Sequence, residues 1–215
     1  MPARGKKSSV ATLAAIARAL NARNAKGLSL PPLLFLTDEK RTPDPLAVAR
    51  KLPRGSGVIL RHYGARNRPQ RAKALARIAR RRGLVLIVAG DATLAKRVGA
   101  QGVHFPGREL KKIAALRRKN PRLLVTASAH GATALAHAAK SGANAALLAP
   151  VFRTKSHPGR KALGAKRFNA LARAAKLPVY ALGGIGAANA KRLARSRACG
   201  IAAIGALISG KDRPR

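Results

Sequence analysis

Short, continuously apolar runs recur along the chain from about residue 31 onward, and basic, alanine-rich segments separate them. Hydrophobicity that is continuous rather than alternating is typical of strands covered on both faces, as in a parallel sheet. The pattern predicts eight strands, in the segments LLFLTD (33–38), GVILRHY (57–63), LVLIVAG (84–90), GVHFP (102–106), LLVTASAH (123–130), ALLAPVF (146–152), PVYALGG (178–184) and GIAAIGAL (200–207).

The segments between these runs have the periodicity of amphipathic helices. Residues 68–83 place one apolar side on Ala72, Leu75, Ala76, Ile78 and Ala79, with Gly83 as a stop signal. Residues 131–143 and 164–178 behave in the same way. Eight closely spaced β-then-α units predict a single (β/α)₈ TIM barrel. A doubly wound open sheet is the alternative, but that fold typically uses fewer strands.

No linker or change of composition divides the chain, so we expect one domain. The barrel is predicted over residues 31–208, with a basic tail at 209–215. Residues 1–30 form a basic N-terminal extension that lacks acidic residues and contains a predicted extra helix at about Val10–Asn21. An organelle transit peptide would have a similar composition, but we favour the helix.

The chain carries 45 Lys and Arg residues against 6 Asp and Glu, a formal net charge of +39. Such a charge attracts phosphate-bearing partners. Lys and Arg occur in every predicted helix, and aromatic residues make up only 3% of the chain. Proteins that bind nucleic acid concentrate charge on one face, and single-strand binders use stacking aromatics. We therefore interpret the charge as a solvated surface and expect no specific nucleic-acid binding.

The remaining composition predicts a protein of the cytoplasm without a membrane span. Cys199 is the one cysteine, so no internal disulfide can form, and we expect it to pack between a helix and a strand. No apolar run reaches the roughly 18 residues that a membrane-spanning helix needs. A homo-oligomer remains possible.

The segment LLAPVFRTKSHPGRKALG (147–164) changes abruptly from apolar residues to anion-binding side chains. In TIM barrels, chemistry lies at the carboxyl ends of the strands, and phosphate often binds after strands seven and eight. Gly183 and Gly184 let backbone N–H groups approach an anion, and a helix expected from about Ala187 would point its positive end there. Ile204 and Gly205 offer further N–H groups. Together these features predict a phosphate site.

Five segments resemble thiamine phosphate synthase and its relative TenI, a thiazole tautomerase. They are GVHFP (102–106), TASAH (126–130), APVFRTKSHPG (149–159), VYALGGI (179–185) and GIAAIGAL (200–207). The resemblance covers roughly residues 31–208. It implies a barrel enzyme of thiamine biosynthesis, which couples a pyrimidine pyrophosphate to a thiazole phosphate and releases pyrophosphate with the help of Mg²⁺.

Carried over residue by residue, the resemblance implies two groups of binding residues. The thiazole-phosphate site would consist of Thr154, Ser156, Gly183, Gly184, Ile204 and Gly205. The pyrophosphate side would contain Arg61 and Ser128, with Lys155 and His157 nearby as further cations.

Several positions depart from the family pattern. Tyr63 and His157 stand where the family has lysines, and the expected Asn-Asp pair reads Ala89-Gly90. Because Mg²⁺ prefers carboxylate oxygens, Asp91 and Glu109 are the predicted metal ligands. Arg66, Arg108 or Lys155 would replace the lost positive charge.

Three functions remain open on these residues. In a synthase, Arg61 and Ser128 would stabilise the departing pyrophosphate. In a TenI-like tautomerase, His130 would move a proton on the thiazole without a metal, because its ordinary pKa lies near neutrality. The third possibility is a catalytically inactive barrel that binds phosphate ligands or nucleic acid. Of the other histidines, His104 lies near the mouth with an open role, while His62 and His137 are expected to be structural or solvated.

Overall fold

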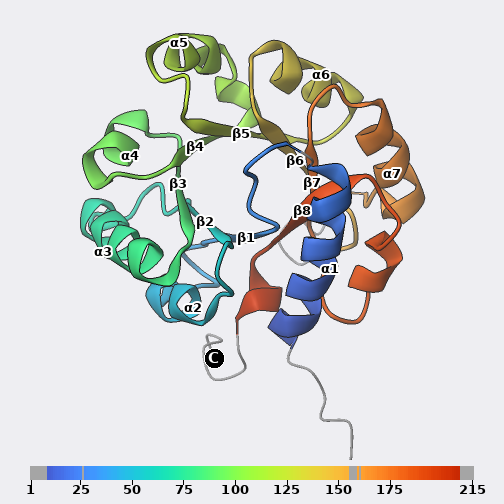
Figure 1. The fold of residues 1–215 in the computed structure, drawn as a ribbon, viewed down its shortest axis with the longest axis horizontal. Helices are drawn as coiled ribbons and strands as arrows, with labels where there is room; N and C mark the ends of the chain where they lie inside the picture. Colours follow the sequence, from blue (N-terminus) through green and yellow to red (C-terminus); the bar gives the residue numbers. More distant parts are fainter. Residues whose placement is uncertain (1–8, 26, 155–158, 160, 209–215) are drawn as a thin grey trace, which may run out of the picture.

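The computed structural model describes residues 9–25, 27–154, 159 and 161–208. Its eight strands form a closed parallel barrel in chain order, so the predicted TIM barrel is confirmed (Figure 1). The strands are β1 (Leu33–Leu36), β2 (Gly57–Leu60), β3 (Val85–Ala89), β4 (Gly102–Phe105), β5 (Leu124–Ala129), β6 (Ala145–Leu148), β7 (Val179–Leu182) and β8 (Ala198–Ala203). Leu34 pairs with Gly57 of β2 on one side and with Ala202 of β8 on the other, which closes the ring.

Six α-helices follow strands and cover the outside of the barrel. They are α2 (Pro45–Lys51), α3 (Arg68–Arg82), α4 (Ala92–Val98), α5 (Lys111–Lys119), α6 (Ala132–Lys140) and α7 (Gly164–Ala174). Three 3₁₀ helices complete the described segments: η1 (Gly107–Glu109), η2 (Ala190–Leu193) and η3 (Gly205–Leu207). Helix α3 follows its prediction closely, because Leu75 and Ala79 lie on the buried side and Gly83 ends the helix in the left-handed conformation at φ 61°.

The prediction of a helix from about Ala187 is wrong. The chain turns after β7 and forms only the short η2. The reason is local: the Asn189 side chain accepts a hydrogen bond from the Gly186 N–H (2.9 Å) and donates one to the Gly184 carbonyl (2.8 Å). Such side-chain bonds to nearby backbone compete with helix formation. The described segment between β7 and β8 therefore contributes no α-helix dipole to these glycines.

The predicted N-terminal helix is present and slightly longer than expected, as α1 (Ser9–Asn24). It lies on the outside of the barrel beside β8 (Figure 1), with Leu13 and Leu20 fully buried. The Asn21 amide donates to the Cys199 carbonyl of β8 at 2.9 Å. Helix α1 thus covers β8 in the way that the other helices cover their strands.

Inward-facing residues fill the barrel, among them Leu34, Ile59 and Tyr180. The Tyr180 hydroxyl donates to the Pro31 carbonyl at 2.7 Å, and its ring lies against Gly200, where any Cβ would clash. Cys199 belongs to this interior, which corrects the expectation that it packs between a helix and a strand. Burial raises the pKa of its thiol. Among the described residues, no helix is long and apolar enough to cross a membrane.

Candidate active site

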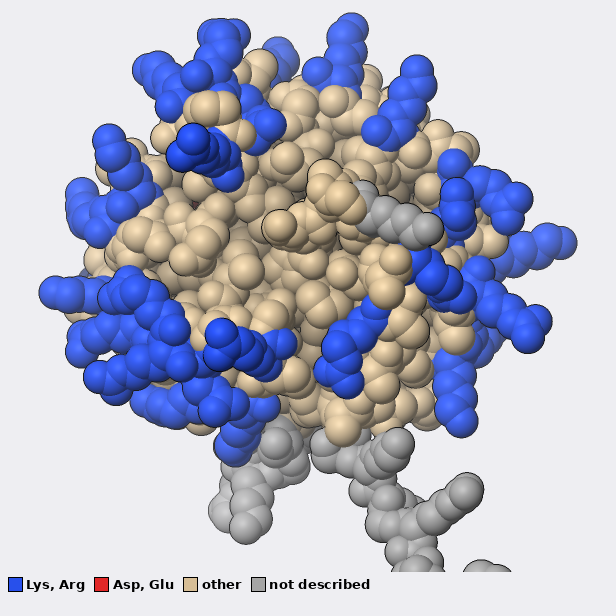
Figure 2. Space-filling model, viewed as in Figure 1, with Lys and Arg blue, Asp and Glu red and all other residues tan. Residues whose placement is uncertain are grey.

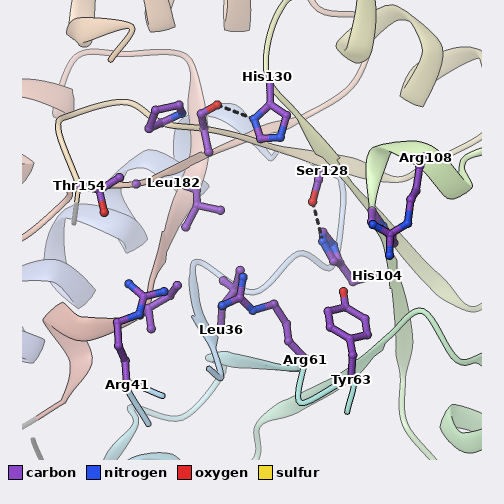
Figure 3. Close-up of a pocket in the computed structure, with 15 residues that line it drawn as sticks. Leu36, Arg41, Arg61, Tyr63, His104, Arg108, Ser128, His130, Thr154 and Leu182 are labelled. Carbon is purple, nitrogen blue, oxygen red and sulfur yellow. Dashed lines mark hydrogen bonds between the residues drawn. The ribbon is translucent and has the colours of Figure 1, made fainter. Parts of the chain in front are cut away.

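A pocket of about 370 Å³ opens at the carboxyl ends of the strands, and we call it the mouth pocket. Figure 3 shows the side chains that line it, with Arg41 and Thr154 on one side and Tyr63 and Arg108 on the other. The full lining is Leu36, Arg41, Arg61, Tyr63, His104, Pro106, Arg108, Ser128, His130, Ala149, Pro150, Thr154, Leu182, Gly183 and Ile204. It includes all three of the predicted catalytic residues, Arg61, Ser128 and His130.

A smaller cavity of about 180 Å³ adjoins the mouth pocket and shares Arg41, Thr154 and Gly183 with it. We call it the glycine cavity, because Gly183, Gly184 and Gly205 also line it. The structure therefore brings together the described members of the predicted phosphate site: Thr154, Gly183, Gly184, Ile204 and Gly205. Lys155, Ser156 and His157 lie outside the described residues.

Two glycines make the glycine cavity possible. Gly183 and Gly184 both have positive φ, at 96° and 66°. A Cβ on Gly184 would overlap the Phe152 carbonyl oxygen at 2.6 Å, and one on Gly183 would lie 2.9 Å from the Cα of Pro150. The loops after β6 and β7 are also joined by a backbone bond from Phe152 N to the Gly183 oxygen (3.0 Å). This close packing draws Thr154 toward the ends of β7 and β8.

Two arginines share one carboxylate at the rim of the mouth pocket. The Nη2 atoms of Arg41 and Arg61 lie 2.9 and 2.7 Å from the same oxygen, Oδ2 of Asp38. Arg61 Nε also donates to the Thr37 carbonyl at 2.8 Å, which fixes the guanidinium in position. The hydrogen bond from Arg41, more than any other effect, lowers the pKa of Asp38 to about 2. One negative and two positive charges leave this group cationic and oriented.

The sequence reasoning missed Arg41 and Asp38. They lie in TDEKR, the segment that directly follows the first strand, and this position after a barrel strand is the signal that could have found them.

His104 lines the mouth pocket and holds the neighbouring Ser128. Its Nδ1 lies 2.9 Å from Thr126 Oγ1, and its Nε2 lies 2.9 Å from Ser128 Oγ. Burial, and to a smaller extent the charge of Arg61, lowers the pKa of His104 to about 3. The imidazole is therefore neutral at physiological pH. It holds the Ser128 hydroxyl in the mouth pocket, which answers the question that the sequence left open for this histidine.

His130 is held at one ring nitrogen. Nδ1 lies 2.8 Å from the Ala149 carbonyl oxygen, and a carbonyl can only accept, so Nδ1 carries the proton. In the neutral ring, Nε2 then holds the lone pair. The two other histidines that the structure describes do not line the mouth pocket. His62 is buried and bonded to Thr37 Oγ1 at 2.8 Å, and His137 is exposed on α6.

The two predicted metal ligands do not line the mouth pocket. Asp91 caps α4, accepting from Leu94 N at 2.8 Å, and its other oxygen lies 3.3 Å from Arg68. Glu109 pairs with Lys112 at 2.9 Å. No group of three or more His, Cys, Asp or Glu that could hold a metal ion occurs in the described part of the chain. The described carboxylates therefore do not fit a preformed Mg²⁺ site.

Tyr63 occupies the place next to these carboxylates. A Cβ on Gly90 would lie 3.2 Å from its ring, so the ring rests on the turn after β3. The Arg68 guanidinium lies over the ring, 5.6 Å from its centroid. Burial raises the pKa of the Tyr63 hydroxyl, so it stays protonated and presents a neutral donor where the family resemblance led us to look for a lysine.

Fold and site together define a (β/α)₈ barrel whose mouth gathers backbone N–H groups, hydroxyls and arginines suited to phosphorylated ligands. A family model described as thiamine monophosphate synthase matches residues 33–207, and the chain belongs to this family. The resemblance stated from the five sequence motifs is thereby confirmed.

Individual relatives agree with this assignment. The chain is 30% identical over 182 residues to a protein of Aquifex aeolicus named putative thiamine-phosphate synthase 2, covering 82% of this chain and 97% of the relative. It is 33% identical over 186 residues to thiamine-phosphate synthase of Chlorobium luteolum, covering 85% and 87%. The solved thiamine phosphate pyrophosphorylase of Pyrococcus furiosus has the same fold, with a TM-score of 0.74, 24% identity and 89% and 92% coverage.

Proposed function

We propose that this protein is a thiamine phosphate synthase, which couples 4-amino-2-methyl-5-hydroxymethylpyrimidine pyrophosphate to thiazole phosphate and releases pyrophosphate. The observation that carries the proposal is the presence of two anion-binding ends in one continuous site. The glycine cavity supplies Thr154 and the backbone around Gly184 for the thiazole phosphate. The other side of the mouth pocket supplies Arg108 and Ser128 for the pyrophosphate, and Arg61 lies between the two ends (Figure 3).

The chemistry needs stabilisation of charge more than a protein nucleophile. The bond between the pyrimidine methylene carbon and the pyrophosphate oxygen breaks, and its electron pair leaves with pyrophosphate. The lone pair of the thiazole nitrogen then forms the new bond to that carbon. Arg61 is already fixed by Asp38 and Thr37, so its charge meets the departing oxygens without reorganisation, which is the most effective form of electrostatic catalysis.

Magnesium is the cofactor that the family resemblance implies, and it stays a prediction. Because Asp91 and Glu109 are paired with basic side chains, the proposal routes no step through a metal. We also expect, from the chemistry of the family, small phosphorylated substrates and a cytoplasmic location, with a homo-oligomer possible.

A TenI-like tautomerase is the second candidate, and the geometry of His130 favours it specifically. With Nδ1–H donated to Ala149, the Nε2 lone pair is suited to take a proton from a thiazole ring and return it at another position. This reaction would use the same thiazole-phosphate end. The tautomerase reaction would not require Arg61.

The test is to incubate the protein with both phosphorylated substrates, with Mg²⁺ or with a chelator, and to measure thiamine phosphate by mass spectrometry. Thiamine phosphate as product supports the synthase, and its dependence on Mg²⁺ decides the question of the metal. Isomerisation of the thiazole carboxylate phosphate without coupling supports the tautomerase. Tight binding of thiazole phosphate with neither reaction would mean that the third possibility, an inactive barrel, is correct.

A further inference from the structure

The described acidic side chains lie at one end of the barrel, whereas basic side chains lie at both ends and are gathered at the end that lacks acids. In a (β/α)₈ barrel the helices run antiparallel to the strands, so the last turns of the helices lie at the amino-terminal face, opposite the mouth. Each of the α-helices α2–α7 has at least one Lys or Arg in its last turn, and α1, whose end leads into β1 at the same face, has Arg23. We call these residues the basic ring. Arg80–Arg82 of α3 and Arg117–Lys119 of α5 are its densest parts.

The acidic residues of the described chain are confined to the other end. Asp38, Glu39 and Asp44 lie between β1 and α2, Asp91 between β3 and α4, and Glu109 in η1 after β4. Figure 2 presents the amino-terminal face, which the segment between α1 and β1 crosses in Figure 1. Lys and Arg surround this face, and no Asp or Glu is visible on it. The cations are spread over all the helices, as the sequence indicates, and those in the last turns lie at this face.

Stabilisation of the helix ends explains why the charge of the basic ring is positive. It does not explain why so many positive charges lie close together. A cation in the last turn stabilises a helix by about 0.3–1 kcal/mol through the helix dipole. Three consecutive cations in α3 also repel one another, and interspersed carboxylates would relieve that repulsion. Nearly all members of the ring are exposed, with only Arg117 partly buried. The amino-terminal face is thus a solvent-facing cationic surface on which no described carboxylate lies.

The positions of the aromatic residues indicate which kind of polyanion this surface can bind. All six are described: Phe35, Phe105, Phe152, Phe168 and Tyr180 are buried, and Tyr63 lines the mouth pocket. The amino-terminal face therefore has no Phe, Tyr or Trp ring on which unpaired bases could stack, and no such anchor for a membrane interface; the exposed imidazole of His137 is the one described ring in the last turns of the helices. A duplex requires neither, because its regularly spaced phosphates are bound by Lys and Arg alone. We propose that the basic ring binds double-stranded nucleic acid through its backbone phosphates, without reading the base sequence.

The experiment measures binding of the full chain to a random-sequence DNA duplex by fluorescence anisotropy over a salt series. The ring variant carries R81Q, R82Q, R118Q and K119Q. The matched control carries K40Q, K111Q, K166Q and R167Q, which remove the same charge from exposed positions on the mouth side. Each phosphate contact contributes about −0.9 to the slope of log K against log salt. We expect the ring variant to lose at least about tenfold in affinity and to have a shallower slope by about 2–4, and the control to stay within about twofold of the parent.

Equal weakening of both variants would overturn the proposal, because net charge rather than the ring would then govern binding. Preference for vesicles of anionic lipid over the duplex, or for single strands over duplex, would overturn it as well. Circular dichroism and the affinity for thiazole phosphate, measured on all three proteins, confirm that each is folded and that the mouth is unaffected. The outcome is independent of which reaction the mouth pocket catalyses.

Discussion

Asp38 provides the sharpest test of how the mouth is assembled. Its Oδ2 atom holds both Arg41 and Arg61, so Asp38→Asn removes the charge that fixes two guanidinium groups while it preserves the shape of the side chain. We expect this variant to lose stability at neutral pH and to lose most of its activity, because Arg61 would no longer be oriented toward the pyrophosphate.

The magnitude follows from the pKa of Asp38. Hydrogen bonding to Arg41 lowers this pKa from 3.8 to about 2. A difference of one pKa unit corresponds to about 1.4 kcal/mol. Because 21% of the side chain remains exposed to water, we expect a loss of about 1–2 kcal/mol in the free energy of unfolding rather than the full value.

The direction of this pKa shift predicts how the free energy of unfolding depends on pH. The folded pKa of Asp38 is depressed, so its contribution is fully present above the unfolded pKa near 4 and is lost as the pH falls toward 2. Urea unfolding of the parent and of Asp38→Asn from pH 7 downward should therefore give two curves that differ at neutral pH and converge in acid.

Asp44→Asn is the matched control. Asp44 caps α2 through Leu46 N and Ala47 N, and asparagine caps a helix about as well as aspartate, so the control should lose under about 0.5 kcal/mol. If Asp38→Asn unfolds at the same urea concentration as the parent at pH 7, or if its deficit stays constant down to pH 2, the assigned role of the carboxylate is wrong.

Three further substitutions test other parts of the molecule. Gly184→Ala should abolish measurable thiazole-phosphate binding by calorimetry, because its Cβ would clash with the Phe152 carbonyl, whereas Gly186→Ala, where a Cβ meets nothing, should bind normally. Leu20→Ala should lower the free energy of unfolding in urea by about 2–5 kcal/mol, since this side chain of α1 is fully buried; a loss below about 0.5 kcal/mol would show that α1 does not stabilise the barrel. His104→Gln should lower kcat about tenfold or more with little change in KM, because it removes the imidazole whose Nε2 is bonded to Ser128 Oγ, and an unchanged kcat would exclude this positioning role.

The barrel was predictable because its strands are covered on both faces. Each strand then needs apolar residues at every position, and the resulting runs stand out against basic helices. The helix α3 was equally clear, since its buried stripe and Gly83 agree with each other. Local periodicity decides such elements, and tertiary contacts add little to them.

The sequence-based predictions failed at places where a single side chain determines the local structure or the composition of the site. Asn189 redirects its own backbone and prevents the helix after β7, although the composition there is that of a helix. Arg41 is held at the pocket by an ion pair with Asp38, a contact that no periodicity encodes. The roles of Asp91 and Glu109 depend on Arg68 and Lys112, which are cations that the sequence alone could not pair with them.

The position of α1 against β8 has a consequence for folding. Asn21 and Cys199 are 178 residues apart in the chain, yet they share a hydrogen bond. The apolar side of α1 therefore stays uncovered during synthesis until the last strand of the barrel emerges. Contacts of such long range slow folding. A ribosome-bound chain that ends before β8 should therefore expose the α1 surface to chaperones, and removal of either segment should leave the other without its cover.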